Sequence, residues 1–410
     1  MSEAAAPHPA FLRDRSQGSR VTNIELFFDL VYVFAVTQLS HYLLHHRTLA
    51  GALQTAVLLA MVWQLWVYTT WLTNWLDPQR IPVRLFLLVL MLVSLAMSAA
   101  LPRAFGDSGL LVGCSYAAMQ IGRSVFAVWA LRGEALQANF VRILAWCCVS
   151  GTLAVLGGVV TSSDLARALL WLGAVGVDLL GGAVGFWTPG LGRTQTQEWN
   201  IEGGHFAERC QAFILIALGE SIVVIGATLT GLLGDPHASH GPAAAAFVVA
   251  FAGSAALWWL YFDRSAEDGA RLIAESADPG RLGRSAYHFI HPIMVAGIIV
   301  VAAGDELVLD RPDAVGVSFT SWLILGGTGL FILGHLAFKL TVWKQLNRPR
   351  GLALVVLALL GLLAPHVSAL TLSCCAAAVV LLVALADHVG PWQIGPATES
   401  GRPAVADSPD

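Results

Sequence analysis

Two carboxylates lie one helical turn apart within the first long apolar run of the chain, residues 24–35. Glu25 and Asp29 fall on the same face of a helix, because a step of four residues returns almost to the starting direction. A charged side chain inside a bilayer costs at least about 3 kcal/mol unless it meets a partner or water. Glu25 can be stabilised as an anion at a helix start, whereas Asp29 lies one turn deeper. Asp29 is therefore either half of an ion pair that locks helices together or a functional acid.

A further acid, Glu220, lies near the middle of a later apolar run, between the small residues Gly219 and Ser221. Small neighbours leave room for a close helix or for a hydrated gap. Arg209 lies on the same helix face, but roughly 16 Å away along the axis, so the two cannot pair directly. Of the acids in apolar runs, Glu220 is the one whose position best fits a functional role.

One arginine and one more acid also lie deep in apolar runs, namely Arg123 and Asp178. Glycines near Asp178 permit a close helix approach, so a structural Arg123–Asp178 salt bridge is the preferred pairing. Deep in the apolar runs there is thus one arginine, Arg123, and there are three acids, Asp29, Asp178 and Glu220. At least one of these acids has no arginine to pair with. Such an acid can bind a cation or carry a proton, as coupled transport requires.

Secondary candidates are polar side chains at the ends of the apolar runs or within them: Glu25, Glu208, Arg209, His291 and His335. The histidines can serve in a proton relay, although a hydrogen-bonded packing histidine is the more common case. No set of metal-ligand residues is complete, and no phosphate-binding loop, dinucleotide-binding motif or nucleophile elbow is found. The sequence therefore predicts no metal, no cofactor and no enzyme activity of a soluble type.

The composition indicates that these side chains belong to membrane-spanning segments. Of the 410 residues, 56% are hydrophobic and only 12% are charged, about half the charged fraction of a soluble protein. Apolar runs near the length that crosses a bilayer occur at 24–44, 51–75, 81–101, 109–131, 140–160, 165–187, 206–230, 243–262, 286–305, 317–338, 351–366 and 368–389. We therefore predict an all-α, polytopic transmembrane helix bundle of about 12 spans. The net charge of −4 argues against nucleic acid as a partner.

The basic residues predict an orientation. With the N-terminus in the cytoplasm, 18 arginines and lysines fall in the inner segments and span ends and only four in the outer ones, the bias that the positive-inside rule describes. Both termini are therefore predicted to be cytoplasmic. The first span is expected to serve as its own insertion signal, because no short apolar region with a small-residue cleavage site precedes it.

Weak similarities between spans indicate an internal repeat. Gly122-Arg123 and Gly334-His335 occupy corresponding spans, and each pair is followed by a phenylalanine at the same spacing. Six spans in each half would insert both halves in the same direction, as a 6+6 parallel repeat. The predicted organisation is a disordered cytoplasmic tail (1–20), a first six-helix half (21–187), a cytoplasmic linker (188–204), a second six-helix half (205–389) and a disordered cytoplasmic tail (390–410).

Two stretches carry a resemblance to a known family. Residues 22–35 (TNIELFFDLVYVFA), followed by Gln38-Leu39, resemble the N-terminal signature of the bacterial low temperature requirement A family. Glu208-Arg209, followed by residues 216–222 (IALGESI), resembles the second signature of that family. The resemblance implies a multi-pass protein of the bacterial plasma membrane, linked by name to growth in the cold, whose biochemical activity is not established.

The leading hypothesis is an ion- or proton-linked transporter or channel-like protein with an acidic intramembrane site. Asp29 and Glu220 would respond to an inorganic cation or a proton, with Arg123 and Asp178 completing the polar site. One alternative is a membrane-embedded enzyme acting on a lipid or isoprenoid, which needs clustered acids and a basic phosphate site. Another is a structural or regulatory membrane protein in cold or stress adaptation, in which every charge is paired. The expected partner in every case is the lipid bilayer; the sequence predicts no oligomeric state.

Overall fold

The structure is a computed structural model that describes residues 11–13, 21–160, 162–194, 203–234, 240–263, 265–276 and 278–389. These residues contain 12 helices that are long and apolar enough to cross a membrane. Within them there is no β-strand, only three isolated backbone bridges. The all-α transmembrane bundle predicted from the sequence is confirmed.

Six spanning helices come first along the chain: α1 (Asn23–His45), α2 (Leu49–Trp75), α3 (Ile81–Ala100), α4 (Gly109–Ala130), α5 (Gln137–Val159) and α6 (Asp164–Ala183). They are followed by α7 (Gly203–Leu233), α8 (His240–Phe262), the short α9 (Ser265–Ala274) and α10 (Pro279–Gly283), α11 (His291–Asp310), α12 (Ser318–Trp343), α13 (Arg348–Leu363) and α14 (Ala369–Val389). A π-helical turn, Arg284–Ile290, joins α10 to α11, so one continuous span runs over Pro279–Asp310.

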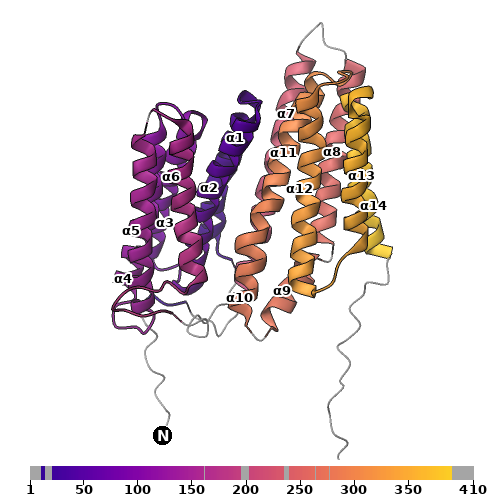
Figure 1. The fold of residues 1–410 in the computed structure, drawn as a ribbon. Helices are drawn as coiled ribbons and strands as arrows, with labels where there is room; N and C mark the ends of the chain where they lie inside the picture. The colour runs from indigo at the N-terminus through magenta and orange to yellow at the C-terminus, as the bar shows by residue number, and fades with distance from the viewer. Residues whose placement is uncertain are drawn as a thin grey trace, which may run out of the picture.

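The helices form two groups (Figure 1). Helices α1–α6 lie on one side of the molecule, and α7–α14 lie on the other. Both α1 and α2 contact α7 and α11, whereas α4 with α5, α8 with α14 and α11 with α12 pair within a group. We call the contact of α1 and α2 with α7 and α11 the group interface.

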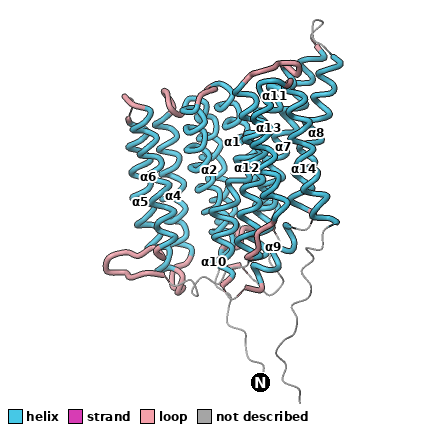
Figure 2. Tube along the Cα trace, turned by 45° about the vertical axis from the view of Figure 1, so that its right-hand side comes forward, coloured by secondary structure: helices cyan, strands magenta, loops and turns pink. Residues whose placement is uncertain are grey.

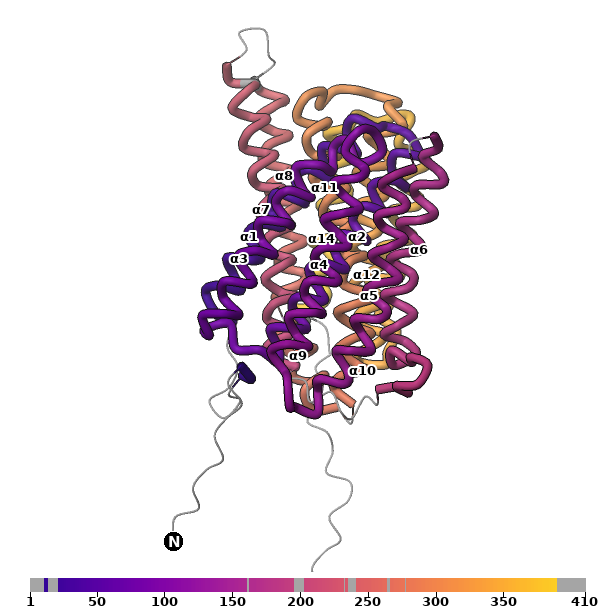
Figure 3. Tube along the Cα trace, turned by 90° about the vertical axis from the view of Figure 1, so that its left-hand side faces the viewer, coloured from indigo at the N-terminus to yellow at the C-terminus, as the bar shows by residue number. Residues whose placement is uncertain are grey.

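The connections lie at the two ends of the bundle, and the helices run between them (Figure 2). α1 begins and α14 ends at the same end, as an even number of spans requires. α7, with 31 residues, extends together with α8 beyond the other helices at the opposite end (Figure 3). Outward faces expose apolar side chains such as Leu85, Leu92 and Leu359, and lipid chains are a suitable environment for them.

Local sequence features set the ends and the spacing of the helices. Glu25 Oε2 accepts hydrogen bonds from the backbone nitrogen and the hydroxyl of Thr22, both at 2.9 Å, and so caps the start of α1. α11 and α12 approach closely because Gly297 has no side chain. A Cβ at Gly297 would lie 2.5 Å from Phe331 N, inside normal contact distance.

The segment predicted as a disordered N-terminal tail contains an ordered contact. Asp77 N donates a hydrogen bond to Phe11 O, and Arg13 N donates to Trp75 O, both at 2.8 Å. Residues 11–13 therefore lie against the end of α2. Residues 1–10 and 14–20, part of the predicted linker (195–202) and the predicted C-terminal tail (390–410) lie outside the described residues. The 6+6 parallel repeat and the cytoplasmic orientation of the termini stay predictions.

Candidate functional site

Asp29 is paired with Arg209 across the group interface. Arg209 Nη2 lies 2.6 Å from Asp29 Oδ1, and Arg209 Nε lies 2.9 Å from Asp29 Oδ2. Trp66 Nε1 donates a third hydrogen bond to Asp29 Oδ1, at 2.7 Å. Asp29 is only 1% exposed and Arg209 is fully buried. Because bidentate, charge-assisted contacts satisfy a carboxylate well, Asp29 is not a free acid.

Glu25 belongs to the same cluster of charges. Its Oε1 lies 2.8 Å from His205 Nε2 and 3.2 Å from Arg209 Nη1, and its Oε2 lies 2.9 Å from Arg13 Nη2. The acids of α1 are four residues apart, as are His205 and Arg209 of α7. Residues with this spacing share a helix face. Successive turns of α1 and α7 therefore place acids and bases opposite each other. We call Glu25, Asp29, His205 and Arg209 the α1–α7 charge cluster.

The partner of Asp29 differs from the one that the sequence predicts. The sequence predicts Arg123 as the arginine available to the buried acids and Arg209 as a secondary candidate, whereas Arg209 is the partner of Asp29. A signal was present in the sequence, because His205 and Arg209 repeat the spacing of Glu25 and Asp29. It was missed because spacing within a run does not say which helix lies alongside.

Arg123 and Asp178 lie near each other, but the predicted salt bridge between them is wrong. Asp178 Oδ2 accepts hydrogen bonds from the Tyr116 hydroxyl and from Gln120 Nε2. Arg123 Nη2 donates to Gln120 Oε1, so a neutral amide stands between the two charges. The physical reason is that Gln120 precedes Arg123 by three residues and shares its face of α4. Arg123 also lies 5.0 Å from the centre of the Tyr68 ring, a cation–π contact.

Glu220 is buried where α7 meets α1, with 1% exposure. Its Oε2 lies 2.5 Å from Thr37 Oγ1, and its Oε1 has no hydrogen-bond partner among the described residues. Thr37 Oγ1 also lies 3.0 Å from the carbonyl oxygen of Val33. Glu220 therefore differs from the acids of the α1–α7 charge cluster, because no basic side chain in the described part of the chain forms an ion pair with it.

The other secondary candidates are dispersed over the bundle. His291 Nε2 lies 3.1 Å from a backbone carbonyl of α7, and His335 Nδ1 lies 3.4 Å from Arg350 Nη2. Glu208 is exposed and accepts a 3.3 Å hydrogen bond from Val21 N. These three side chains are not members of the α1–α7 charge cluster.

A second ion cluster was not predicted from the sequence. Asp387 of α14 lies 2.6 Å from Arg350 Nη2 of α13 and 3.1 Å from Lys339 Nζ of α12. Arg350 is fully buried. The three residues lie near span ends, where water normally solvates charges, so the sequence held no signal for their pairing. The cluster ties the ends of three neighbouring helices together.

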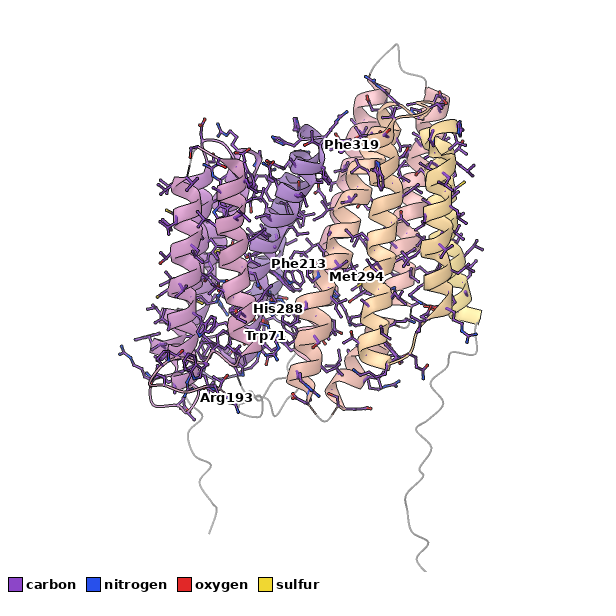
Figure 4. All side chains as sticks on the ribbon, in the orientation of Figure 1. Trp71, Arg193, Phe213, His288, Met294 and Phe319 are labelled. Atoms are coloured by element: carbon purple, nitrogen blue, oxygen red, sulfur yellow. The ribbon has the colours of Figure 1, made fainter. Side chains whose placement is uncertain are left out.

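A cavity of about 500 Å³ opens between the two groups of helices. We call it the interface cavity. Its charged or titratable wall residues are Arg123, Asp178, Arg193, Arg284 and His288, and its aromatic ones are Tyr68, Trp71, Trp75, Phe140, Phe186 and Phe289. Figure 4 shows Arg193 near one end of the bundle, with Trp71 and His288 farther in. The cavity was not predicted, because part of its wall comes from segments outside the apolar runs.

Comparison with known proteins identifies relatives of this chain. A family model described as "Bacterial low temperature requirement A protein (LtrA)" matches residues 20–385. An uncharacterized protein of Rhizobium meliloti (strain 1021) is 32% identical over 389 residues, which cover 94% of this chain and 93% of the relative. No solved structure matches the chain. The two stretches that carry the resemblance lie on α1 and α7 and include the paired Asp29 and Arg209. The chain therefore belongs to the bacterial low temperature requirement A family, as a multi-pass membrane protein.

Proposed function

We propose that this protein is a proton-linked membrane transporter in which Glu220 carries the coupling proton. The observation that carries the proposal is the arrangement of Glu220 and Thr37 at the group interface. The acids of the α1–α7 charge cluster are neutralised by Arg209 and its neighbours. Glu220 therefore replaces Asp29 as the leading candidate for the proton-responsive group.

The hydrogen-bond distances around Glu220 support this role. Thr37 has one hydroxyl hydrogen, yet its Oγ1 lies within hydrogen-bond distance of two acceptor atoms, Val33 O and Glu220 Oε2. A hydroxyl donates one hydrogen bond at a time. Both contacts are satisfied together when the Glu220 carboxyl is protonated and donates to Thr37, while Thr37 donates to Val33. The geometry thus suits a carboxyl group that holds a proton.

The location of Glu220 is also suitable for coupling. Glu220 lies on α7 and Thr37 lies on α1, so their contact joins the two groups of helices. Many transporters place their coupling sites between helix units that move against each other. Movement of one group against the other would separate Glu220 from Thr37 and change the environment into which the proton is released.

A structural role is the second candidate, because Glu25 and Asp29 contact the two arginines Arg13 and Arg209, and Asp387 pairs with Arg350. Buried ion pairs of this kind can have a purely structural role, in which they fix the register of neighbouring helices. Under this alternative Glu220 is a packed side chain, and its replacement by glutamine would leave membrane permeability unchanged.

Proton flux into proteoliposomes tests the proposal. The parent protein and the variants Glu220→Gln and Glu208→Gln are reconstituted with an internal pH-sensitive dye, and flux is started by a potassium diffusion potential. Glu208 is the matched control, because it is an exposed carboxylate on the same helix. We expect Glu220→Gln to reduce the flux to that of protein-free liposomes and Glu208→Gln to retain it. Parent-level flux in Glu220→Gln, or no flux in the parent protein, would sink the proposal.

A further inference from the structure

The interface cavity is large enough to hold a small organic molecule. Its volume of about 500 Å³ lies within the range of roughly 300–1,000 Å³ that is typical of ligand pockets. Its wall combines residues of α2, α4, α5 and α6 with residues of the turn that precedes α11. A ligand in this cavity would therefore contact both groups of helices.

The charges in the cavity wall favour an anion. Among the described residues, the cavity wall holds three arginines, Arg123, Arg193 and Arg284, and one acid, Asp178. Within the described residues these arginines form no ion pair; Arg284 Nη1 donates to a backbone oxygen, Gly182 O, at 2.7 Å. Guanidinium groups without a carboxylate partner bind carboxylates and phosphates through their paired N–H donors.

The aromatic part of the wall favours an apolar body attached to that anion. The rings of Trp71 and Trp75 stack with their centres 6.0 Å apart, and Phe140 meets Trp75 edge-on at 5.7 Å. All three residues line the cavity. Aromatic walls contribute binding energy by covering the apolar surface of a ligand. An inorganic anion would use the arginines and leave this wall uncovered.

We propose that the interface cavity binds an amphipathic organic anion. A carboxylate or phosphate head contacts Arg284 and Arg193, and an apolar body lies against Trp71 and Trp75. The inference rests on the proposed function in one respect, because it names the substrate class that would move together with the Glu220 proton.

Two kinds of molecule combine an anionic head with an apolar body. A water-soluble organic acid has such a head and body, and so does an anionic lipid, whose head group can enter a basic pocket between transmembrane helices. Binding is therefore measured in nanodiscs of phosphatidylcholine and, separately, in nanodiscs that also contain phosphatidylglycerol. Lower binding of a soluble probe in the second set identifies the lipid as an occupant; equal binding identifies the soluble acid.

The probe is radiolabelled phenylpropionate, and its binding to the full chain is measured with three unlabelled competitors. Phenylpropionate itself should displace the label. Phenylpropylamine has the same body with a positive head, and inorganic phosphate has an anionic head without a body, so neither should compete. Equal competition by the amine would overturn the anion preference, and equal competition by phosphate would overturn the role of the aromatic wall.

Three arginine variants test where the probe binds. We expect Arg284→Gln to weaken binding by about tenfold, as the loss of a charged hydrogen bond predicts, and Arg193→Gln to weaken it as well. Arg281→Gln is the matched control, because Arg281 is 73% exposed, pairs with Asp278 and lies outside the cavity wall. Arg193 is also exposed, so its variant provides a test even if Arg284→Gln fails to fold. Parent-level binding in the folded cavity variants would overturn the proposal.

The proposed cavity site and the proposed transport function are rejected by different results. Saturable binding of phenylpropionate without proton flux would support the cavity site and reject the transporter. Proton flux that Glu220→Gln abolishes, without binding of the probe, would support the transporter and reject this cavity as its substrate site.

Discussion

Replacing Arg209 by methionine removes the base that contacts two buried acids. Methionine is flexible and apolar and fills much of the same space. Arg209 makes two hydrogen bonds to Asp29 and one to Glu25, and all three side chains are buried. Removing one partner of a buried ion pair costs about 3–5 kcal/mol, because the other charge stays buried and unpaired. We therefore expect Arg209→Met to lower the free energy of unfolding by at least about 3 kcal/mol.

The free energy of unfolding can be measured by denaturant titration of the purified protein in bicelles, followed by tryptophan fluorescence. Arg281→Met provides the control for loss of an exposed arginine. The double variant Asp29→Asn/Arg209→Met should be more stable than Arg209→Met alone, because the second change removes the uncompensated anion. Together with the single variant Asp29→Asn, these measurements complete a double-mutant cycle, which gives the coupling energy between the two residues.

Two results would refute this reasoning. One is an Arg209→Met protein whose unfolding free energy lies within about 0.5 kcal/mol of the parent, as for a surface substitution. The other is a double variant that is less stable than Arg209→Met. Either result would mean that Arg209 does not neutralise Asp29 in the folded protein.

Two further predictions concern Glu220 and the packing of α11 on α12. Thr37→Val removes the hydroxyl that contacts Glu220 and should lower proton flux in the liposome assay, whereas Thr37→Ser keeps the hydroxyl and should retain flux; equal flux in both would contradict the role of this contact. Gly297→Ala should lower the free energy of unfolding by about 1–3 kcal/mol, because its Cβ would lie 2.5 Å from Phe331 N. In the control Gly326→Ala the new Cβ meets nothing within 4 Å, so a similar loss in both glycine variants would refute the close-packing argument.

The spanning helices could be predicted from the sequence because length and hydropathy are local properties of the chain. The run predicted at 24–44 is the helix Asn23–His45, and even the short run at 351–366 is the span Arg348–His366. Residues 11–13 were missed for the opposite reason. Their order comes from contacts with the end of α2, and a short segment gives no sign of such contacts in its own composition.

The pairing of the charges could not be predicted in the same way. Hydropathy indicates which side chains enter the membrane, but not which helices lie side by side. Asp29 and Arg209 are separated by 180 residues in the chain. The Arg123–Asp178 prediction failed because only charged groups were considered as partners, whereas the neutral amide of Gln120 contacts both.

The α1–α7 charge cluster also has a consequence for the order of biosynthesis. Arg13 precedes α1 and contacts Glu25, so this acid has a positive partner as soon as α1 is made. Asp29 must wait for Arg209, whose synthesis follows 180 residues later, roughly 10–40 s at ribosomal rates. During that interval α1 holds an unpaired acid in the bilayer or at the insertion machinery. We therefore expect a chain that ends after α6 to be retained there or degraded, and the arrival of α7 to be the event that releases the first six helices into the membrane.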